Sequence, residues 1–378
     1  MFSLKQATAA IASKPEFTVR DRGEYVVIDY NVSFKETFVG VTDEETKILM
    51  NLRGTAFDKN TGNIIRLGYH KFFNYGEFPE TDKTLDFSQD HLITVKLDGS
   101  CIFPLYTGTS GFELGTRAGV TDVSKMATDW MESDLLRLDS YGRFIKACRM
   151  LGITPIFEFC SRKNRVVLDY PEDMLVLTGM RFIRSGEYLS RKLVRDFGLR
   201  AFIPVVECIV EDLSNDFDGF HQYIKTLKNE EGVVISFPNG HMLKMKGDEY
   251  CLKHKALDSL RYEKDVILLS LEGLIDDVLP ILDTVTKDRV EVHLITFWTM
   301  FYETARKIEQ AYDFYRYEKT QKAFAEEVAG DKYKSFLFSL RAGKNVVDLL
   351  KDYCKKQCGT QQKTIDMKKF LNFDVVYN

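Results

Sequence analysis

Long apolar runs are lacking in this sequence. The first thirteen residues have no apolar stretch of the kind that a signal peptide needs. The most apolar C-terminal segment, residues 294–302, is far too short to span a bilayer. The seven cysteines are odd in number and scattered along the chain, and their spacing is not that of a metal site. We therefore expect a cytoplasmic protein with reduced thiols, in the host-cell cytoplasm if it is viral.

A strong charge of either sign is also lacking. Lys and Arg number 52 against 56 Asp and Glu, which gives a net charge of −4. This balance excludes a uniformly basic surface for nucleic acid but leaves a local basic cleft open. Hydrophobic residues at 44% and charged residues at 29% are ordinary for a soluble globular protein. The 378 residues are enough for two or three domains with a sizeable core.

Two regions of the chain differ in their patterns. Short β-like runs punctuated by glycine and Asn/Asp turns dominate up to residue 255, with helical patterns interrupting them irregularly. We therefore expect an α+β domain with largely antiparallel sheets over residues 1–255. The expected strands are residues 25–30, 63–69, 91–95, 101–106, 153–159, 165–170, 174–183, 204–210, 232–237 and 242–245. The expected helices of this domain are residues 123–151, 190–197 and 216–229.

From residue 256 to residue 378 the patterns become helical and predict an all-helical C-terminal domain. The expected helices are residues 288–317, 320–328, 333–340 and 345–356. The last segment, residues 341–378, carries eight Lys and Arg against four Asp. Its positive charge fits an RNA-facing surface and fits the solvated face of a small helical bundle equally well.

The run Lys96-Leu97-Asp98-Gly99-Ser100 is the first candidate for chemistry. It follows a strand-like run, so Lys96 stands where a strand ends and the chain turns at Asp98-Gly99. A lysine in a cleft becomes a nucleophile when its amine is deprotonated. The motif Lys-x-Asp-Gly has only three fixed residues and is a weak signal alone. A surface lysine before a hairpin turn would show the same residues.

Two carboxylates stand at unusual places downstream. Glu158 lies between Phe157 and Phe159, and strand alternation puts it on the face opposite to both rings. If the rings face the core, Glu158 faces a cleft; the alternative is that it faces water. Glu231 precedes a hydrophobic strand at Gly232, where it fits either a cleft edge or the end of a helix.

Four cations complete the candidate set. Lys244 and Lys246 are two apart on an expected strand, so both point to one face. Arg53 and Lys71 lie upstream, and plain surface charge is the alternative for each. Together with Lys96 they suit the transfer of a nucleoside monophosphate to an amine. That reaction needs an unprotonated lysine, cations along a triphosphate and carboxylates for a divalent metal.

This ordered set resembles motifs of the covalent nucleotidyltransferases, the superfamily of DNA ligases, RNA ligases and mRNA capping enzymes. The matching residues are Lys96-x-Asp98-Gly99, Phe157-Glu158-Phe159, Glu231-Gly232 and Lys244-x-Lys246. Local signatures narrow the resemblance to the bacteriophage RNA ligase 1 family, the tRNA-repair type. They are Leu52-Arg53-Gly54, Lys71-Phe72-Phe73-Asn74, and Glu158-Phe159 followed by Asn164-Arg165-Val166-Val167-Leu168 and Tyr170. The resemblance covers about residues 53–250.

The resemblance implies an ATP-dependent, AMP-forming RNA ligase that uses Mg²⁺ or Mn²⁺. In such an enzyme Lys96 attacks the ATP α-phosphate, and pyrophosphate leaves. The AMP then moves to an RNA 5′-phosphate, and a 3′-hydroxyl displaces it. The helical domain would confer RNA specificity. A cleaved tRNA and an end-healing polynucleotide kinase-phosphatase are the implied partners, with no membrane involved.

Residue roles follow from the same resemblance. The implied nucleotide-binding residues are Arg53, Lys71, Lys96, Arg117, Glu158, Glu231, Lys244 and Lys246. Of these, Lys96, Lys244 and Lys246 are implied to be catalytic, and Glu158 and Glu231 to hold the metal. Arg53 and Lys71 would grip the β- and γ-phosphates, and Arg117 falls where the family carries a basic residue.

The chain departs from related patterns at two positions. Many DNA ligases carry Glu two residues before the lysine, where this chain has Thr94, so adenine recognition must rest on other groups. The family tends to show an aromatic residue before a tyrosine near Lys246, and this chain has Glu249 before Tyr250. A DNA ligase or capping-type enzyme remains an alternative, although those normally append a strand-rich barrel. A non-catalytic RNA-end-binding protein is the third reading.

Overall fold

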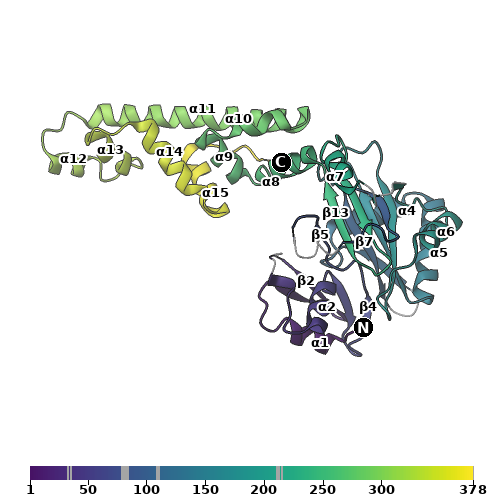
Figure 1. Cartoon of the computed structure of the whole chain (residues 1–378). Helices are drawn as coiled ribbons and strands as arrows, with labels where there is room; N and C mark the ends of the chain where they lie inside the picture. The colour runs from purple at the N-terminus through teal and green to yellow at the C-terminus, as the bar shows by residue number, and fades with distance from the viewer. Residues whose placement is uncertain are drawn as a thin grey trace. The chain divides into compact units, whose positions relative to one another are not determined.

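The computed structural model describes residues 1–31, 34, 36–77, 85–107, 111–209, 213 and 216–377 (Figure 1). The chain forms two compact units, Met1–Cys251 and Leu252–Asn378. The first unit mixes helices with mainly antiparallel sheets and the second is helical, which confirms the predicted α+β class with a helical C-terminal part. The division between the units falls inside α8 (Asp248–Ser259), which also contains the predicted boundary after residue 255.

The N-terminal part of the first unit is a four-stranded antiparallel sheet in the order β1-β2-β3-β4. Helices pack on it, and Ala7, Ile28 and Leu49 are fully buried in the shared core. The elements are β1 (Phe17–Asp21), β2 (Tyr25–Tyr30), β3 (Thr55–Asp58), β4 (Ile64–Arg66), α1 (Leu4–Ala10), η1 (Glu36–Phe38) and α2 (Asp43–Asn51).

Two further sheets complete the first unit. The first has the order β11-β6-β12-β13-β5, antiparallel except for the β13-β5 pair, and the second the antiparallel order β10-β9-β7-β8. The strands of the first are β11 (Cys208–Ile209), β6 (Leu92–Lys96), β12 (Gly232–Ser236), β13 (Met242–Lys246) and β5 (Phe73–Asn74). Those of the second are β10 (Met174–Phe182), β9 (Ile153–Cys160), β7 (Ser100–Thr107) and β8 (Gly111–Gly115). The helices are α4 (Asp122–Glu132), α5 (Leu135–Met150), α6 (Arg191–Arg200) and α7 (Phe217–Lys225).

Three sequence predictions in this unit were wrong in detail. The predicted strand at 165–170 is a loop, because the amides of Val167 and Leu168 donate to the Asp98 carboxylate instead of to a strand. The predicted helix over 123–151 is two helices, because Asp134 caps a new start by accepting from two backbone amides. Of the predicted strand 204–210, only β11 forms among the described residues.

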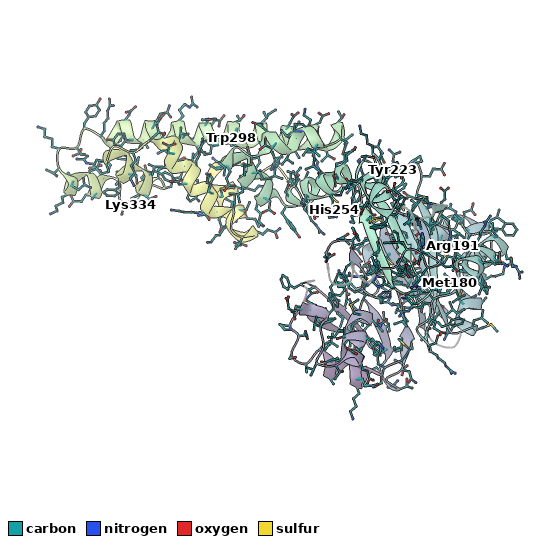
Figure 2. All side chains as sticks on the ribbon, in the orientation of Figure 1. Met180, Arg191, Tyr223, His254, Trp298 and Lys334 are labelled. Carbon is teal, nitrogen blue, oxygen red and sulfur yellow. The ribbon has the colours of Figure 1, made fainter. Side chains whose placement is uncertain are left out.

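The second unit is built around the long helix α11 (Thr284–Tyr315). Phe297 and Phe301 of α11 are fully buried in its core. The indole of Trp298, which Figure 2 labels on this helix, donates to the Ser270 hydroxyl. The other helices are α9 (Glu263–Glu272), α10 (Ile275–Val278), η2 (Leu279–Ile281), α12 (Gln321–Glu327), α13 (Lys334–Arg341), α14 (Val346–Gln357) and α15 (Gln361–Leu371). Residues 252–377, all of them described, contain no strand. None of the helices described in the chain has the length and apolarity to cross a membrane.

A glycine fixes the turn between β6 and β7. A Cβ atom on Gly99 would lie 2.5 Å from the carbonyl oxygen of Phe159 on β9, a separation that no side-chain carbon tolerates. The backbone of the turn is therefore pressed against β9, and this contact holds the end of β6, and Lys96 with it, beside the second sheet.

Two glycine-to-alanine substitutions are expected to change stability in opposite directions. Gly99→Ala must displace β9 or the turn, so it should lower the free energy of unfolding by about 1–3 kcal/mol. Gly142 lies inside α5 with open space around it, so Gly142→Ala should raise the same free energy by about 0.5–1 kcal/mol. Urea unfolding followed by circular dichroism measures both, and equal effects would contradict the packing described for the turn.

Candidate functional site

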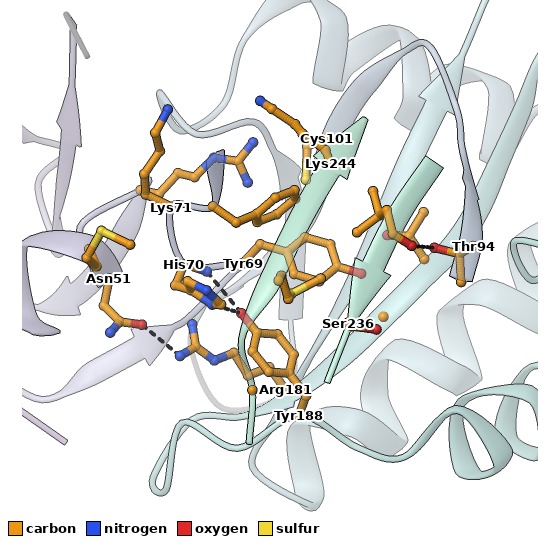
Figure 3. Close-up of a pocket in the computed structure, with 18 of the residues that line it drawn as sticks. Asn51, Tyr69, His70, Lys71, Thr94, Cys101, Arg181, Tyr188, Ser236 and Lys244 are labelled. Carbon is orange, nitrogen blue, oxygen red and sulfur yellow. Dashed lines mark hydrogen bonds between the residues drawn. The ribbon is translucent and has the colours of Figure 1, made fainter. Parts of the chain in front are cut away.

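A cavity of about 1760 Å³ lies in the first unit, lined by residues of all three sheets and of α2. Its lining includes most of the residues singled out in the sequence, namely Arg53, Lys71, Lys96, Arg117, Glu158 and Lys244. Figure 3 shows Lys71 and Lys244 above Tyr69, with Thr94 and Ser236 on the neighbouring strands. Glu231 and Lys246 are not among the lining residues, but Glu231 pairs with both Lys96 and Lys246.

Lys96 and Lys246 share one carboxylate. The Nζ atom of Lys96 lies 2.8 Å from Oε2 of Glu231, and the Nζ atom of Lys246 lies 2.9 Å from Oε1. Glu231 is 3% exposed, so both of its oxygens are committed in a buried setting. Strand register explains the convergence, because Gly232 pairs with Lys96 on one side and with Lys246 on the other. The sequence singled out all three residues but could not show that one carboxylate joins the two lysines.

Glu158 faces the cavity while its neighbours face the core. Phe157 and Phe159 are buried in the core under α4 and α5, and Glu158 lines the cavity wall. The predicted alternation is thus what the strand shows. Burial raises the pKa of the Glu158 carboxyl to about 7, with Lys96 opposing the shift and Glu231 adding to it. A carboxyl of this kind changes charge near neutral pH.

The carboxylate of Asp98 anchors the lysine turn. It is buried, accepts from the amides of Val167 and Leu168 at 2.8 and 2.7 Å, and accepts from the Tyr250 hydroxyl at 2.7 Å. The amide of Asp98 donates to the Tyr170 hydroxyl at 2.9 Å. These contacts give Asp98 a structural role beside the nucleophile. Tyr250 was missed as a functional residue because only its neighbour, Glu249, drew attention in the sequence.

Three cations surround the aromatic ring of Phe72 and its neighbours. Arg53 and Lys244 each lie 5.9 Å from the centre of the Phe72 ring. Lys71, which is buried, lies 4.6 Å from the centre of the Phe73 ring. Desolvation, with Lys71, Lys96 and Lys246 nearby, lowers the pKa of the Lys244 amine to about 7. A cluster of like charges without a bound counter-ion is costly, and an anion such as a polyphosphate relieves that cost.

Arg117 joins this cluster from the end of β8. Its guanidinium lies 4.5 Å from the centre of the Tyr30 ring and donates to the Tyr30 hydroxyl at 3.0 Å. Its Nη2 atom lies 3.3 Å from the buried Asp29 carboxylate. Gly54, with φ +71°, packs so closely on Arg117 that a Cβ would lie 2.6 Å from the Arg117 Cα. The structure therefore brings Arg53 and Arg117 to one edge of the cavity.

A neutral histidine lines another part of the cavity wall. His70 is held by Tyr188, whose hydroxyl lies 2.8 Å from Nδ1 and accepts from the His70 amide at 3.0 Å (Figure 3). Desolvation, with Arg181 and other cations nearby, lowers the pKa of His70 to about 3. Arg181 itself donates to the Gly68 carbonyl and to Asn51, which ties α2 to β10. No sequence signal marked Tyr188 or Arg181, because each of these contacts spans more than a hundred positions.

The site offers few side chains that could bind a metal ion. Among the described residues, no three His, Cys, Asp or Glu side chains gather closely enough to hold a metal ion alone. Glu231 pairs with Lys96 directly, and Glu158 lines the same cavity and interacts electrostatically with Lys96. Mg²⁺ is commonly held by one or two carboxylates together with water and substrate phosphates, so this donor set fits a metal that arrives with a nucleotide.

One protein-family model matches this chain. The model of the RNA ligase family typified by T4 RNA ligase 1 matches residues 51–257, more than half of the chain. A Thermovibrio ammonificans protein, named as a candidate RNA ligase, is 27% identical in an alignment 343 positions long; the match covers 86% of this chain and 84% of that protein.

Several solved structures are similar in part. An archaeal ATP-dependent RNA ligase is 11% identical with a TM-score of 0.45, over 98% of this chain and 82% of that one. A Naegleria gruberi RNA ligase variant with AMP and Mn is 14% identical with a TM-score of 0.39, over 50% of this chain. That match spans 58% of the Naegleria chain. Because the family model matches more than half of its residues, the chain belongs to the RNA ligase family of the T4 RNA ligase 1 type.

Proposed function

We propose that the protein is an ATP-dependent RNA ligase that joins 5′-phosphate and 3′-hydroxyl RNA ends through a covalent lysyl-AMP at Lys96. One observation carries the proposal: Lys96 opens onto a cavity whose wall gathers Arg53, Lys71 and Lys244. Its Nζ atom is also held by Glu231, which binds Lys246 as well. Family membership supports the RNA class of the substrate.

The first step forms a phosphorus–nitrogen bond. The Lys96 amine, after losing its proton, attacks the α-phosphorus of ATP, and the bond to the pyrophosphate oxygen breaks. In the second step the RNA 5′-phosphate oxygen displaces Lys96 and becomes adenylated. In the third step the RNA 3′-hydroxyl attacks that 5′-phosphorus and AMP leaves. Each step exchanges one bond to phosphorus for another, so no further reactant is needed.

The cations stabilise the charge that develops on the departing phosphates. Arg53, Lys71 and Arg117 lie along one edge of the cavity and are assigned to the β- and γ-phosphates, while Lys244 and Lys246 are assigned to the α-phosphate and the orientation of pyrophosphate. Charge-assisted hydrogen bonds of this kind are stronger in a water-poor cavity than in bulk solvent. Asp98 contributes by fixing the backbone from which Lys96 projects.

A divalent cation, Mg²⁺ or Mn²⁺, would be held by Glu158 and Glu231 together with ATP oxygens. Bound there, the cation would supply positive charge that favours the unprotonated lysine and neutralises phosphate. The two oxygens of Glu231 pair with the ammonium groups of Lys96 and Lys246. A metal that binds Glu231 would therefore weaken its ion pair with Lys96. Glu158 would serve as a metal ligand in its ionised form only.

The helical unit is assigned to RNA specificity, and a cleaved tRNA is the proposed substrate. The family resemblance supports this assignment, as does the excess of Lys and Arg over residues 341–378. An end-healing kinase-phosphatase would supply the required 5′-phosphate and 3′-hydroxyl. A DNA ligase or capping-type enzyme is disfavoured, because residues 252–377 form helices where those enzymes carry a strand-rich barrel.

Lys96→Ala is expected to abolish the label transferred to the protein from α-labelled ATP, by roughly a thousandfold or more, because the nucleophile is gone. The same variant should still seal an RNA whose 5′ end is already adenylated, since that substrate bypasses Lys96. Lys125→Ala, an exposed lysine on α4, is the control and should label normally. Labelling of Lys96→Ala at the native rate would contradict the proposal, and labelling from GTP alone would favour a capping enzyme.

Nucleotide affinity is expected to fall as pH rises through about 7. Bound polyphosphate favours the Lys244 ammonium, whose pKa is about 7 in the free protein. Above that pH, binding must take up a proton, which weakens affinity by up to about tenfold per pH unit. Below it Lys244 is already charged, so its contribution is constant. Lys244→Arg stays cationic throughout and should flatten the dependence.

Calorimetry with a non-hydrolysable ATP analogue, without metal, from about pH 6 to 9 measures this effect. Omitting the metal removes the opposing requirement for an ionised Glu158, whose pKa is also about 7. An identical pH profile for the native protein and Lys244→Arg would show that Lys244 does not contact the nucleotide phosphates.

A further inference from the structure

Helix α6 begins at the wall of the cavity. Its N-cap residue Ser190 lines the cavity with Arg191 and Val194, and no α6 residue after Val194 does. Val194 and Gly198 are buried, and a Cβ atom on Gly198 would clash with the side chain of Val205. One face of α6 is therefore fixed by close packing, and the opposite face is open to solvent.

The open face carries cations that no described carboxylate neutralises. Lys192 and Arg195 are exposed, and within the described part of the chain neither lies within ion-pair distance of an acidic side chain. Arg191 differs, because its guanidinium donates to the Val206 carbonyl and, at 2.9 Å, to the Cys208 sulfur. Lys192 and Arg195 are thus accessible positive charges beside the cavity wall.

The start of α6 also lacks the features that stabilise a helix N-terminus. Acidic side chains are favourable in the first turn because of the helix dipole, whereas α6 has Arg191 and Lys192 there and no acid. The side chain of Ser190 makes no capping hydrogen bond. Positive charge is therefore concentrated where it is least favourable for the free helix, and an anion bound there would relieve this repulsion.

The other end of α6 exposes an aromatic ring on a strained backbone. Phe202 has φ +55° and is 87% exposed. The amide of Ile203 donates to the Gly198 carbonyl, so Phe202 takes the left-handed position after a helix that glycine or asparagine usually fills. Phenylalanine is unfavourable there both for its backbone and for its exposed apolar surface. Leu199, which is 60% exposed, precedes it on the same side of the helix.

We infer that this open face binds a single-stranded segment of RNA next to the end that enters the cavity. We call it the α6 stripe, and its residues are Lys192, Arg195, Leu199 and Phe202. The two cations contact phosphates and the ring of Phe202 stacks on a base, which is the combination by which proteins hold single strands.

The inference rests on the proposed RNA-joining function and adds a surface outside the nucleotide cavity. Phosphates and base faces are common to all nucleotides, so the α6 stripe contributes affinity and no choice of sequence. An anionic membrane is the less suitable partner, because the stripe has only two apolar side chains and a membrane-binding helix needs a wide apolar face.

Salt-dependent binding tests the phosphate contacts. A single-stranded RNA with a 5′-phosphate is bound at equilibrium, without ATP, over a series of salt concentrations. Each phosphate contact on a single strand contributes about 0.7 to the slope of log affinity against log salt, so the double variant Lys192→Ala, Arg195→Ala should have a slope shallower by about 1.4.

The matched control is the double variant Lys125→Ala, Lys146→Ala. It removes the same charge from exposed positions on α4 and α5 that do not line the cavity, and it should keep the native slope.

Phe202→Asn separates stacking from folding. Asparagine tolerates the left-handed backbone better than phenylalanine, so the urea midpoint of unfolding should stay the same or rise. RNA affinity should nevertheless fall about fivefold or more, with the salt slope unchanged, as the loss of one stacked base implies. Tyr223→Ala, which removes an exposed ring on α7 (Figure 2), is the control and should bind RNA as the native protein does.

Two results would overturn the inference and leave the proposed function standing. One is native affinity and native salt slope in both α6 variants. The other is normal RNA binding by these variants together with lost binding to vesicles of phosphatidylserine and phosphatidylcholine, which would make the stripe a membrane surface. If the native protein neither binds nor seals RNA, the proposed function is wrong and the inference falls with it.

Discussion

The site depends on one row of backbone pairing across three strands. Gly232 of β12 pairs with Lys96 of β6 and with Lys246 of β13, so the two lysines flank the position next to Glu231. Only glycine fits there, because its φ is +144° and a Cβ would lie 2.0 Å from the Met245 carbonyl oxygen. The row brings two ammonium groups to one buried carboxylate. A shift of register by one residue would turn both lysines to the other face of the sheet.

The second consequence of this row is an excess of positive charge on the cavity side. Lys244 follows Lys246 at a spacing of two, so it faces the cavity among Lys71 and Arg53 with no carboxylate of its own in the described interactions. Its pKa near 7 reflects that cost, and the raised pKa of Glu158 reflects burial of the nearest acid. Both groups are set to change charge when a polyphosphate and a metal enter. The charges of the cavity thus suit a highly charged ligand, such as a polyphosphate with its metal ion.

Strand alternation and order along the chain were enough to single out residues that the fold brings to one cavity, although their chemical roles stay predictions. Glu158 opposite two phenylalanines, and Lys244 and Lys246 on one face, followed from a period of two. The partners of Asp98 did not follow, since Tyr250 lies 152 positions away and the amides of Val167 and Leu168 act through a loop that resembled a strand.

Other parts of the fold could not be predicted from local sequence patterns, for similar reasons. Helix α15 was not predicted, because few of its side chains are apolar and its burial comes from packing on α14 and α11. Asp29 carried no signal at all, as an acidic residue in an apolar strand reads as a surface position until the fold surrounds it. Such residues owe their burial to contacts between distant segments, and only the assembled structure shows them.

Peptide mapping by mass spectrometry is the most direct measurement of the central claim. The protein is incubated with ATP and Mg²⁺ in the absence of RNA, digested under mildly alkaline conditions that preserve a phosphorus–nitrogen bond, and analysed for an adenylyl group. We predict the adduct on Lys96 and its loss when RNA with a 5′-phosphate is added. An adduct confined to Lys244 or Lys246, or no adduct on an otherwise active protein, would contradict the account.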